Sequence, residues 1–367
     1  MKDREIDFQH GMTQKQTRFD QIKKFLKIQD EPSYRFDQIA GAVFKQGVGD
    51  FEGMTILPKN LRRELKEKFG SILSLRLVDE TESRQATKVL FELEDGERIE
   101  VVKMSFRNKE KEWGSLCISS QVGCSLGCAF CATGKIGLKR NLTADEIISQ
   151  PLYFLLEGNG VNNVSFMGMG EPLANPNIFA ALGVLTDKKL FAFSPRRLSV
   201  STVGIVPALK RLVAEFPQVN IAFSLHTPFE EQRKELMPIT RQYSIQRVLE
   251  VLDNHIKKTR RKVFLPYLML KGINDSHEHL EALKSLVLGK GDIAYLYHIN
   301  LVRYHSTPGI EECFKPSSNE TIEAFRRELE RTRIGVTVRQ SFGTDIQAAC
   351  GQLYARYEAE KRERAEA

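Results

Sequence analysis

The sequence predicts an α/β fold in which a partial (βα)6, TIM-like barrel follows a small N-terminal helical domain. From Cys117 onward, short β-branched runs alternate with amphipathic helical patterns. Such alternation is typical of parallel strands that are joined by crossover helices. A second observation agrees with it. Small or polar motifs directly follow several predicted strands, which is where barrel enzymes build their sites.

The expected elements follow from the changing hydrophobic period along the chain. Strands are expected at residues 89–93, 99–104, 116–119, 163–166, 198–201, 220–224, 262–270, 295–303 and 336–339. Helices are expected at residues 143–156, 178–185, 206–216, 245–257, 277–287 and 320–333. The first two strands precede the alternating region and lead into the core.

The region before this core differs in texture. Residues 1 to about 85 carry apolar positions three and four apart, such as Ile22, Phe25 and Leu26, and basic residues are interspersed among them. A solvated helix surface and an RNA-binding face would both explain these charges. We expect an N-terminal helical, RNA-binding accessory domain at 1–85, a catalytic core at 86–353 and a charged tail at 354–367.

The overall composition permits a polyanionic partner without requiring one. The 367 residues carry a formal net charge of +7, and 41% of them are hydrophobic, which is enough for a sizeable core. An ordinary basic surface would give the same balance. Because no apolar run reaches membrane length and the start is polar, we expect a soluble, cytoplasmic protein with no membrane partner.

The most specific motif is a loop of three cysteines, Cys124, Cys128 and Cys131, in the spacing C-x3-C-x2-C after a predicted strand. Three thiolates can hold three irons of a cubane cluster and leave the fourth iron open for a ligand. An electron-carrier ferredoxin or a structural zinc site would need a fourth ligand nearby. No further cysteine follows closely, and after the loop no histidine occurs before His226.

This loop, followed by βα units, resembles the radical S-adenosylmethionine (radical SAM) superfamily. The resemblance implies a [4Fe–4S] cluster whose open iron binds S-adenosylmethionine. The stretch from Gly168 to Pro172 resembles the superfamily motif that binds the methionyl amino group, with Gly170 and Glu171 as contacts. Alone, the glycines of this stretch would indicate only a tight turn.

The resemblance extends over most of the chain to the RlmN/Cfr family of RNA adenosine methyltransferases, and is closer to Cfr. It implies that the remaining S-adenosylmethionine contacts are Ser201, Ser224, Leu225, His226 and Asn300, each near a predicted strand end. Without the family, the two serines would be interpreted as caps of the segments that follow them.

The same resemblance assigns the chemistry to three further residues. Cys350, in a Gly-Thr-Asp-Ile-Gln-Ala-Ala-Cys stretch, matches the methyl-accepting cysteine, which is first methylated and then loses a hydrogen to the radical. Glu100 matches the proton acceptor, and Cys117 matches the thiol that resolves the protein–RNA adduct with disulfide formation. Alone, Cys350 would be considered a small buried residue and Glu100 a solvated one. Cys313 receives no role.

The substrate implied is one adenosine of the peptidyl-transferase centre of 23S rRNA. Cfr-like enzymes methylate its C8 and confer resistance to ribosome-targeting antibiotics, whereas RlmN-like enzymes methylate C2 and can act on a tRNA adenosine. Four stretches, such as that from Arg233 to Ile239, favour C8, but Pro172 and Val122 match RlmN. The other expected partner is an electron donor such as flavodoxin. We expect no second subunit, so that the enzyme is a monomer. A non-catalytic iron–sulfur or zinc RNA-binding protein is the alternative from another class.

Four arginines could contact RNA phosphates, because a guanidinium suits them, or could form surface ion pairs instead. These are Arg196, Arg197, Arg303 and Arg339.

Overall fold

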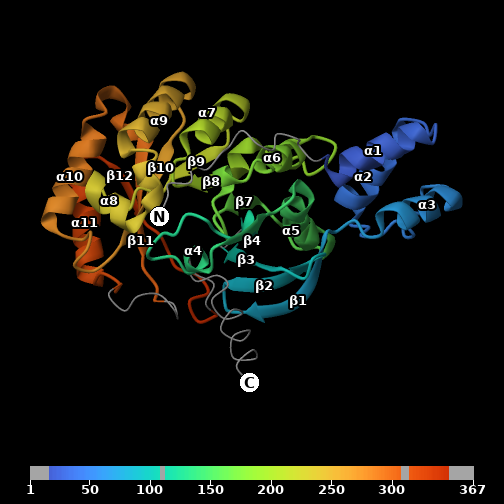
Figure 1. The fold of residues 1–367 in the computed structure, drawn as a ribbon, viewed down its shortest axis with the longest axis horizontal. Helices are drawn as coiled ribbons and strands as arrows, with labels where there is room; N and C mark the ends of the chain where they lie inside the picture. The colour runs from blue at the N-terminus through green and yellow to red at the C-terminus, as the bar shows by residue number, and fades with distance from the viewer. Residues whose placement is uncertain (1–15, 108–111, 307–313, 347–367) are drawn as a thin grey trace.

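A computed structural model describes residues 16–107, 112–306 and 314–346 of the chain (Figure 1). Cys313, Cys350 and the charged tail lie outside these residues. No helix in the described ranges is long and apolar enough to cross a membrane.

One open sheet of ten strands forms the centre of the fold, in the order β1-β2-β3-β4-β7-β8-β9-β10-β11-β12. The first four strands pair antiparallel, and every pairing from β4 to β12 is parallel. The strands are β1 Leu75–Glu82, β2 Ala86–Leu93, β3 Arg98–Arg107, β4 Glu112–Ile118, β7 Asn163–Phe166, β8 Leu198–Thr202, β9 Asn220–Phe223, β10 Val263–Met269, β11 Tyr297–Arg303 and β12 Gly335–Val338. The prediction of a partial barrel is confirmed.

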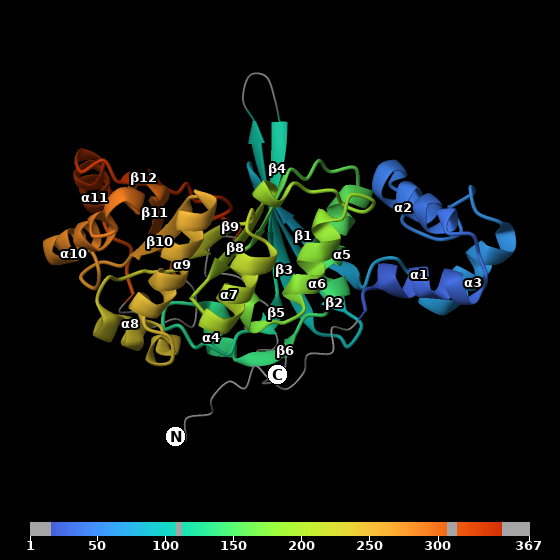
Figure 2. The same cartoon turned by 90° about the horizontal axis from the view of Figure 1, so that it is seen from above.

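Helices cover the outer face of the parallel strands, as Figure 2 shows from above. They are α5 Ala144–Leu156, α6 Ile178–Thr186, α7 Val206–Glu215, α8 Glu230–Leu236, α9 Ile245–Thr259, α10 His277–Leu288 and α11 Asn319–Arg331. Local sequence fixes several of their starts. Thr143 accepts a hydrogen bond from the Glu146 amide and so caps α5, while Ser244 and Ser318 cap α9 and α11 in the same way.

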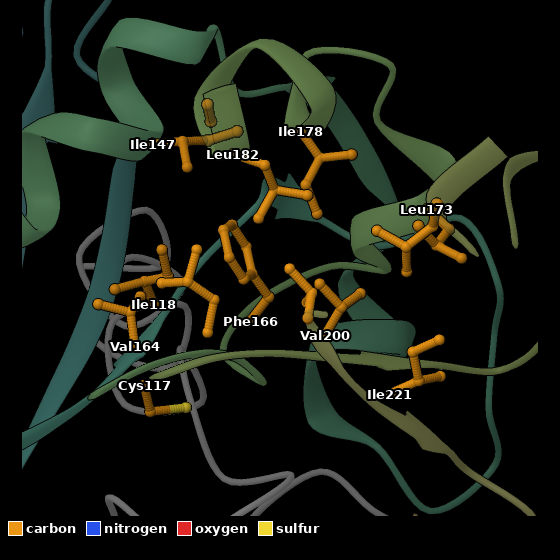
Figure 3. Packing of buried hydrophobic residues seen from close by; sticks show 14 of the residues in the cluster. Cys117, Ile118, Ile147, Val164, Phe166, Leu173, Ile178, Leu182, Val200 and Ile221 are labelled. Carbon is orange, nitrogen blue, oxygen red and sulfur yellow. The ribbon is translucent and has the colours of Figure 1, made fainter. Parts of the chain in front are cut away.

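The core lies between these helices and the sheet. In Figure 3, Ile147, Ile178 and Leu182 from the helices pack over Phe166 and Val200 from the strands, and all five side chains are buried. The Cys117 side chain points away from this cluster, toward the inner face of the sheet. The strands therefore divide residues between a helix-covered core and an inner face that is available for chemistry.

Three helices form the N-terminal module: α1 Arg18–Ile28, α2 Tyr34–Gln46 and α3 Lys59–Phe69. Their predicted apolar face is buried, and Phe44 contacts Phe191 of the core with ring centroids 4.7 Å apart. Helix prediction fails just beyond them, because β1 at 75–82 is a strand. Its residues are mostly exposed, and its antiparallel pairing with β2 rather than a hydrophobic period determines its conformation.

Candidate active site

A cavity opens at the carboxyl ends of the parallel strands, and we call it the carboxyl-end cavity. All three cysteines of the C-x3-C-x2-C loop contribute to its wall. Five other predicted contacts, Gly170, Glu171, Ser201, Ser224 and His226, line it from the ends of β7, β8 and β9. Side chains also reach it from β10, β11 and the segment after β12, which contribute Leu268, Tyr304 and Arg339.

The cysteine loop follows the short strand β5 (Gln121–Gly123) and ends in the helix α4 (Ala132–Ile136). Gly127 takes a left-handed φ of 60°, which a glycine adopts without strain. The Ala129 amide donates to the Leu236 carbonyl over 2.9 Å, so that the end of α8 holds the loop. The Phe130 ring meets the His226 ring edge-on at 5.1 Å, which links the loop to the end of β9.

Two of the three thiols, Cys124 and Cys128, lie in a desolvated environment beside other thiols. Burial raises the pKa of Cys124 to about 12 and that of Cys128 well above its ordinary value, and the neighbouring thiolates add to both effects. Both thiols therefore remain protonated at neutral pH until a metal binds and displaces the protons, as is usual for buried metal-binding cysteines. Within the described chain, no three His, Cys, Asp or Glu side chains converge on a single-ion site.

This donor set fits an iron–sulfur cubane. In such a cluster each cysteine binds a different iron, so that the sulfurs need not converge on one point. The rest of the wall leaves space beside the loop, and it carries both hydroxyls and an acidic group for a polar ligand of the fourth iron.

The motif after β7 is held by close packing and by hydrogen bonds. A Cβ on Gly168 would lie 2.7 Å from the Ile118 carbonyl oxygen, and a Cβ on Gly170, whose φ is 92°, would lie 2.5 Å from Cβ of Gln121. Both positions require glycine. The Glu171 amide donates to Oε1 of Gln121 over 2.8 Å, which fixes the direction of this turn.

The Glu171 carboxylate is buried and joins two strand ends. It accepts hydrogen bonds from the Thr202 hydroxyl at 2.5 Å and the Val203 amide at 3.0 Å, both at the end of β8. Burial raises its pKa to about 7, although these donors pull in the other direction. With this pKa the Glu171 side chain is present in both ionisation states at neutral pH. It can therefore bind an ammonium group and can accept a proton from it.

His226 is held in one tautomer. Its Nδ1 accepts a hydrogen bond from the Leu268 amide at 3.0 Å, and its backbone has a φ of 59°. Burial lowers its pKa to about 3, so the ring is neutral at physiological pH and carries its proton on Nε2. Nearby, the hydroxyls of Ser201 and Ser224 lie 3.4 Å apart and face the same cavity.

Two other predicted contacts do not line the cavity. The Leu225 side chain is fully buried in the core, and only its backbone takes part, through a carbonyl that accepts from Arg233. Asn300 lies in the middle of β11, two residues before Val302, which does line the cavity. Two strand residues span about 7 Å, so Asn300 lies one side-chain layer below Val302.

The residues expected to process the adduct lie on neighbouring antiparallel strands. Cys117 of β4 pairs with Val102 of β3 and is in register with Ser165 of β7. Glu100 of β3 is buried, and one of its carboxylate oxygens is 3.5 Å from the Lys88 ammonium. Neither residue lines the carboxyl-end cavity, and Cys350 is outside the described residues.

Sequence reasoning missed Arg233, which is fully buried behind the cavity. Its guanidinium donates to the carbonyl oxygens of Val203, Ser224 and Leu225 at 3.0, 2.8 and 3.1 Å. Burial lowers its pKa to about 10, which still leaves it charged at neutral pH. An arginine in a helix that begins with two glutamates is usually exposed. The sequence therefore contains no signal that distinguishes Arg233 from a surface cation.

The open barrel and its three-cysteine loop define a class of protein. Residues 118–283 match the model of the radical SAM superfamily, and residues 15–70 match that of the ribosomal RNA large subunit methyltransferase N-terminal domain. A radical SAM methyltransferase from Sphaerobacter thermophilus has a similar structure, with a TM-score of 0.84 and 36% identity, over 93% of this chain and 98% of that one.

Curated relatives narrow the class. The chain is 51% identical over 347 residues to the ribosomal RNA large subunit methyltransferase Cfr of Shouchella clausii, covering 94% of this chain and 98% of the relative. It is 50% identical to Cfr of Staphylococcus aureus, covering 93% and 97%. The chain belongs to the Cfr family of ribosomal RNA large subunit methyltransferases. As a radical SAM enzyme it uses a [4Fe–4S] cluster and S-adenosylmethionine.

Proposed function

We propose that this enzyme methylates C8 of one adenosine in the peptidyl-transferase centre of 23S rRNA, and so protects the ribosome from antibiotics that bind there. One observation carries the proposal. A cavity lined by three cysteines and a buried glutamate occurs in a chain that matches Cfr enzymes over nearly its full length. An RlmN-type reaction at C2 is the second candidate, favoured by Pro172 and Val122.

In this proposal, Cys124, Cys128 and Cys131 hold the cluster. When bound, the cluster supplies the electron that cleaves S-adenosylmethionine to a 5′-deoxyadenosyl radical. Glu171 and the Gly170 backbone receive the amino end of the cofactor, because the carboxylate is buried, polar and adjacent to the loop. Ser201, Ser224 and the Nε2–H of His226 are the hydrogen-bonding groups for its remaining polar atoms.

Three side chains then transfer the methyl group. Cys350 takes a methyl by displacement, gives up one hydrogen from it and adds the resulting carbon to the adenine ring. Glu100 accepts the ring proton, the Lys88 ammonium holds its carboxylate in position, and the adduct gives up one electron, which the cluster would take back. The Cys117 thiolate then attacks the sulfur of Cys350 to form a disulfide. The bond between that sulfur and the methylene carbon breaks, and this carbon takes up a proton to become the methyl group of the released base.

The domain division remains part of the proposal: an RNA-binding accessory domain at 1–85, the methyltransferase core at 86–353 and a charged tail at 354–367. The proposal also includes a monomeric state and an electron donor such as flavodoxin. It places the enzyme in the cytoplasm, where the large-subunit rRNA is found. Protein-free or early-assembly 23S rRNA is the substrate form that exposes the base.

Mass spectrometry of nucleosides from 23S rRNA treated with the anaerobically reconstituted enzyme tests the proposal. We expect 8-methyladenosine. Detection of 2-methyladenosine alone would replace it with the RlmN-type activity. Absence of both products and of 5′-deoxyadenosine under reduction would favour a non-catalytic RNA-binding protein.

A further inference from the structure

Two segments of the core are basic and contain no acidic residue. Residues 188–214 include Arg196 and Arg197 but no aspartate or glutamate, and residues 254–274 include the run Lys-Lys-Thr-Arg-Arg-Lys at 257–262, again without an acid. The arginine pair directly precedes β8, and the run spans the end of α9 and the turn into β10. Both segments therefore place their charges at the amino ends of the parallel strands.

The fold joins these two segments through one side chain. Strand β9 lies between β8 and β10 in the sheet, and Asn220 is its first residue. The Asn220 amide nitrogen donates to the Arg196 carbonyl at 2.7 Å, and its amide oxygen accepts from the Arg261 guanidinium at 2.5 Å. We call the basic residues of the two segments at these strand starts the strand-start cations. They are Arg196, Arg197, Lys257, Lys258, Arg260, Arg261 and Lys262.

Asn220 also lines a hollow of about 580 Å³ inside the barrel, which we call the amino-end hollow. Asn163 and Ser199, near the starts of β7 and β8, line it as well. The hollow is separated from the carboxyl-end cavity by Arg339 and Met167, which line both spaces and contact each other at 3.2 Å. The strand-start cations that Asn220 bonds therefore lie at the opposite end of the barrel from the cysteine loop.

The charge of the strand-start cations is not compensated by the protein. In the described part of the chain, none of the seven forms an ion pair with an acidic side chain. The Arg260 guanidinium donates to a neutral group, the Tyr295 hydroxyl. Asp253, the last acidic residue before the run, is instead paired with Lys290 at 2.8 Å. Such an uncompensated basic surface is what a polyanion with many phosphates requires.

Two of these cations also act on each other. Burial lowers the pKa of Arg261, and the positive charge of Arg196 lowers it further. The Arg261 Nε is buried, and it has no hydrogen-bond partner among the residues that the structure describes. Two guanidinium groups held together in this way destabilise the free protein. An anion that both can reach removes the repulsion, and a phosphate suits the planar fork of each guanidinium.

We propose that the strand-start cations bind the RNA backbone near the target adenosine, with one phosphate shared by Arg196 and Arg261. This inference rests on the proposed function and identifies which cations of the core hold the substrate. Strand β8 rises about 13 Å from its first residue to its last, which is roughly the length of four stacked nucleotides. The cations therefore bind nucleotides that flank the target, while the target base leaves its stack to react.

Replacing Arg197, Lys257 and Lys262 together by Gln in the reconstituted full-length enzyme tests this surface. All three side chains are exposed. Kd for a 23S rRNA fragment should rise at least about ten-fold, and the slope of log Kd against log salt should become shallower by roughly 0.7–0.9 for each phosphate no longer neutralised. KM for methylation should rise with Kd while kcat is unchanged, because backbone contacts are equally strong before and during the reaction.

The matched control replaces Arg241, Lys271 and Lys315 by Gln. It also removes one arginine and two lysines, all exposed. Arg241 ends the 3-10 helix Pro238–Arg241, which follows α8, and Lys271 follows the end of β10, so this charge lies toward the other end of the barrel. The control variant should change Kd and the salt slope little.

Arg196→Gln separates binding from folding. Because its removal relieves the repulsion on Arg261, the midpoint of thermal unfolding should stay the same or rise, while RNA affinity falls. Arg196→Lys keeps the charge, so it should retain the salt slope but bind RNA more weakly than the wild type, since an ammonium lacks the planar fork. A lower midpoint with wild-type RNA affinity would make Arg196 a structural residue and overturn the shared phosphate.

Equal effects of the two charge triples on Kd and salt slope would overturn the inference, as would wild-type affinity in the strand-start triple. The nucleoside that the wild-type enzyme produces is measured in parallel and does not depend on these outcomes. Weakened RNA binding in the strand-start triple, together with no methyladenosine from the wild type, would uphold the surface and refute the proposed function. Normal binding in that triple, together with 8-methyladenosine from the wild type, would do the reverse.

Discussion

The two spaces inside this barrel differ in how their polar groups are satisfied. Around the carboxyl-end cavity, protein groups hold Glu171, His226 and Arg233 through short hydrogen bonds. At the amino ends of the same strands, Arg196 and Arg197 precede β8 and Lys262 precedes β10, and none of them forms an ion pair with an acidic side chain among residues 16–107, 112–306 and 314–346. Fixed groups suit a cofactor that returns to the same pose in every cycle, whereas uncompensated cations suit a substrate that brings its own charges.

The largest expected effect concerns the proposed methyl carrier. Cys350→Ala should abolish RNA methylation, because the carbon no longer has a carrier, while reductive cleavage of S-adenosylmethionine continues. Liquid chromatography of 5′-deoxyadenosine alongside nucleoside analysis measures both. Cys313→Ala is the matched control and should retain methylation. Methylated RNA from the Cys350 variant would exclude the carrier role.

Arg233→Met should be the most damaging change behind the carboxyl-end cavity. Each buried carbonyl that is left unpaired costs about 1–3 kcal/mol, so the free energy of unfolding should fall by about 3 kcal/mol or more. Denaturant unfolding measures this, and iron content after reconstitution shows whether the cysteine loop is still positioned. Arg233→Lys keeps the charge and should lose less. Exposed Arg247→Met is the control, and an equal loss there would contradict the argument.

Gly170→Ala should weaken binding of S-adenosylmethionine at least about ten-fold, because the new Cβ needs space that Gln121 occupies and the φ of 92° is strained for alanine. Isothermal titration of the reconstituted enzyme measures the affinity. Gly183→Ala, in the open face of α6 with nothing within 4 Å, should bind normally. Equal binding by the two variants would show that the turn after β7 tolerates a side chain.

A smaller effect is expected from pH. The pKa of His226 is lowered by folding to about 3, below its unfolded value, so the unfolded chain binds more protons between these pH values. This residue's stabilisation is present above about pH 6.5 and is lost as pH falls toward 3, by at most about 1.4 kcal/mol per pH unit. His226→Gln should flatten the pH dependence of unfolding in that range, and an unchanged slope would mean that the ring is not buried neutral.

The sequence was most informative where function requires a fixed local pattern. The cysteine spacing and the glycines near Glu171 could be recognised directly, and the alternation of hydrophobic periods located nine of the ten sheet strands to within a few residues. Strand β1 was missed because pairing with β2, rather than its own exposed residues, makes it a strand.

Two side chains show what local patterns cannot provide. Asn300 is assigned to the cofactor by resemblance, but its position in the middle of β11, one layer below Val302 of the carboxyl-end cavity, depends on the register of the strands and could not be read from the sequence. Arg233 looks like a surface cation in the sequence. In the fold, three carbonyls from the residues that directly follow β8 and β9 accept hydrogen bonds from its guanidinium. Both depend on distant segments, which no short pattern encodes.

The division of work between the cofactor cavity and the methyl-carrying cysteine can be tested most directly on a trapped complex. Cys117→Ala should prevent resolution and leave the target adenosine covalently attached to Cys350. Mass spectrometry of the protein after reaction with a 23S rRNA fragment should therefore find the nucleotide on the peptide that contains Cys350. Free methylated RNA at the wild-type rate, with no nucleotide on that peptide, would contradict the account.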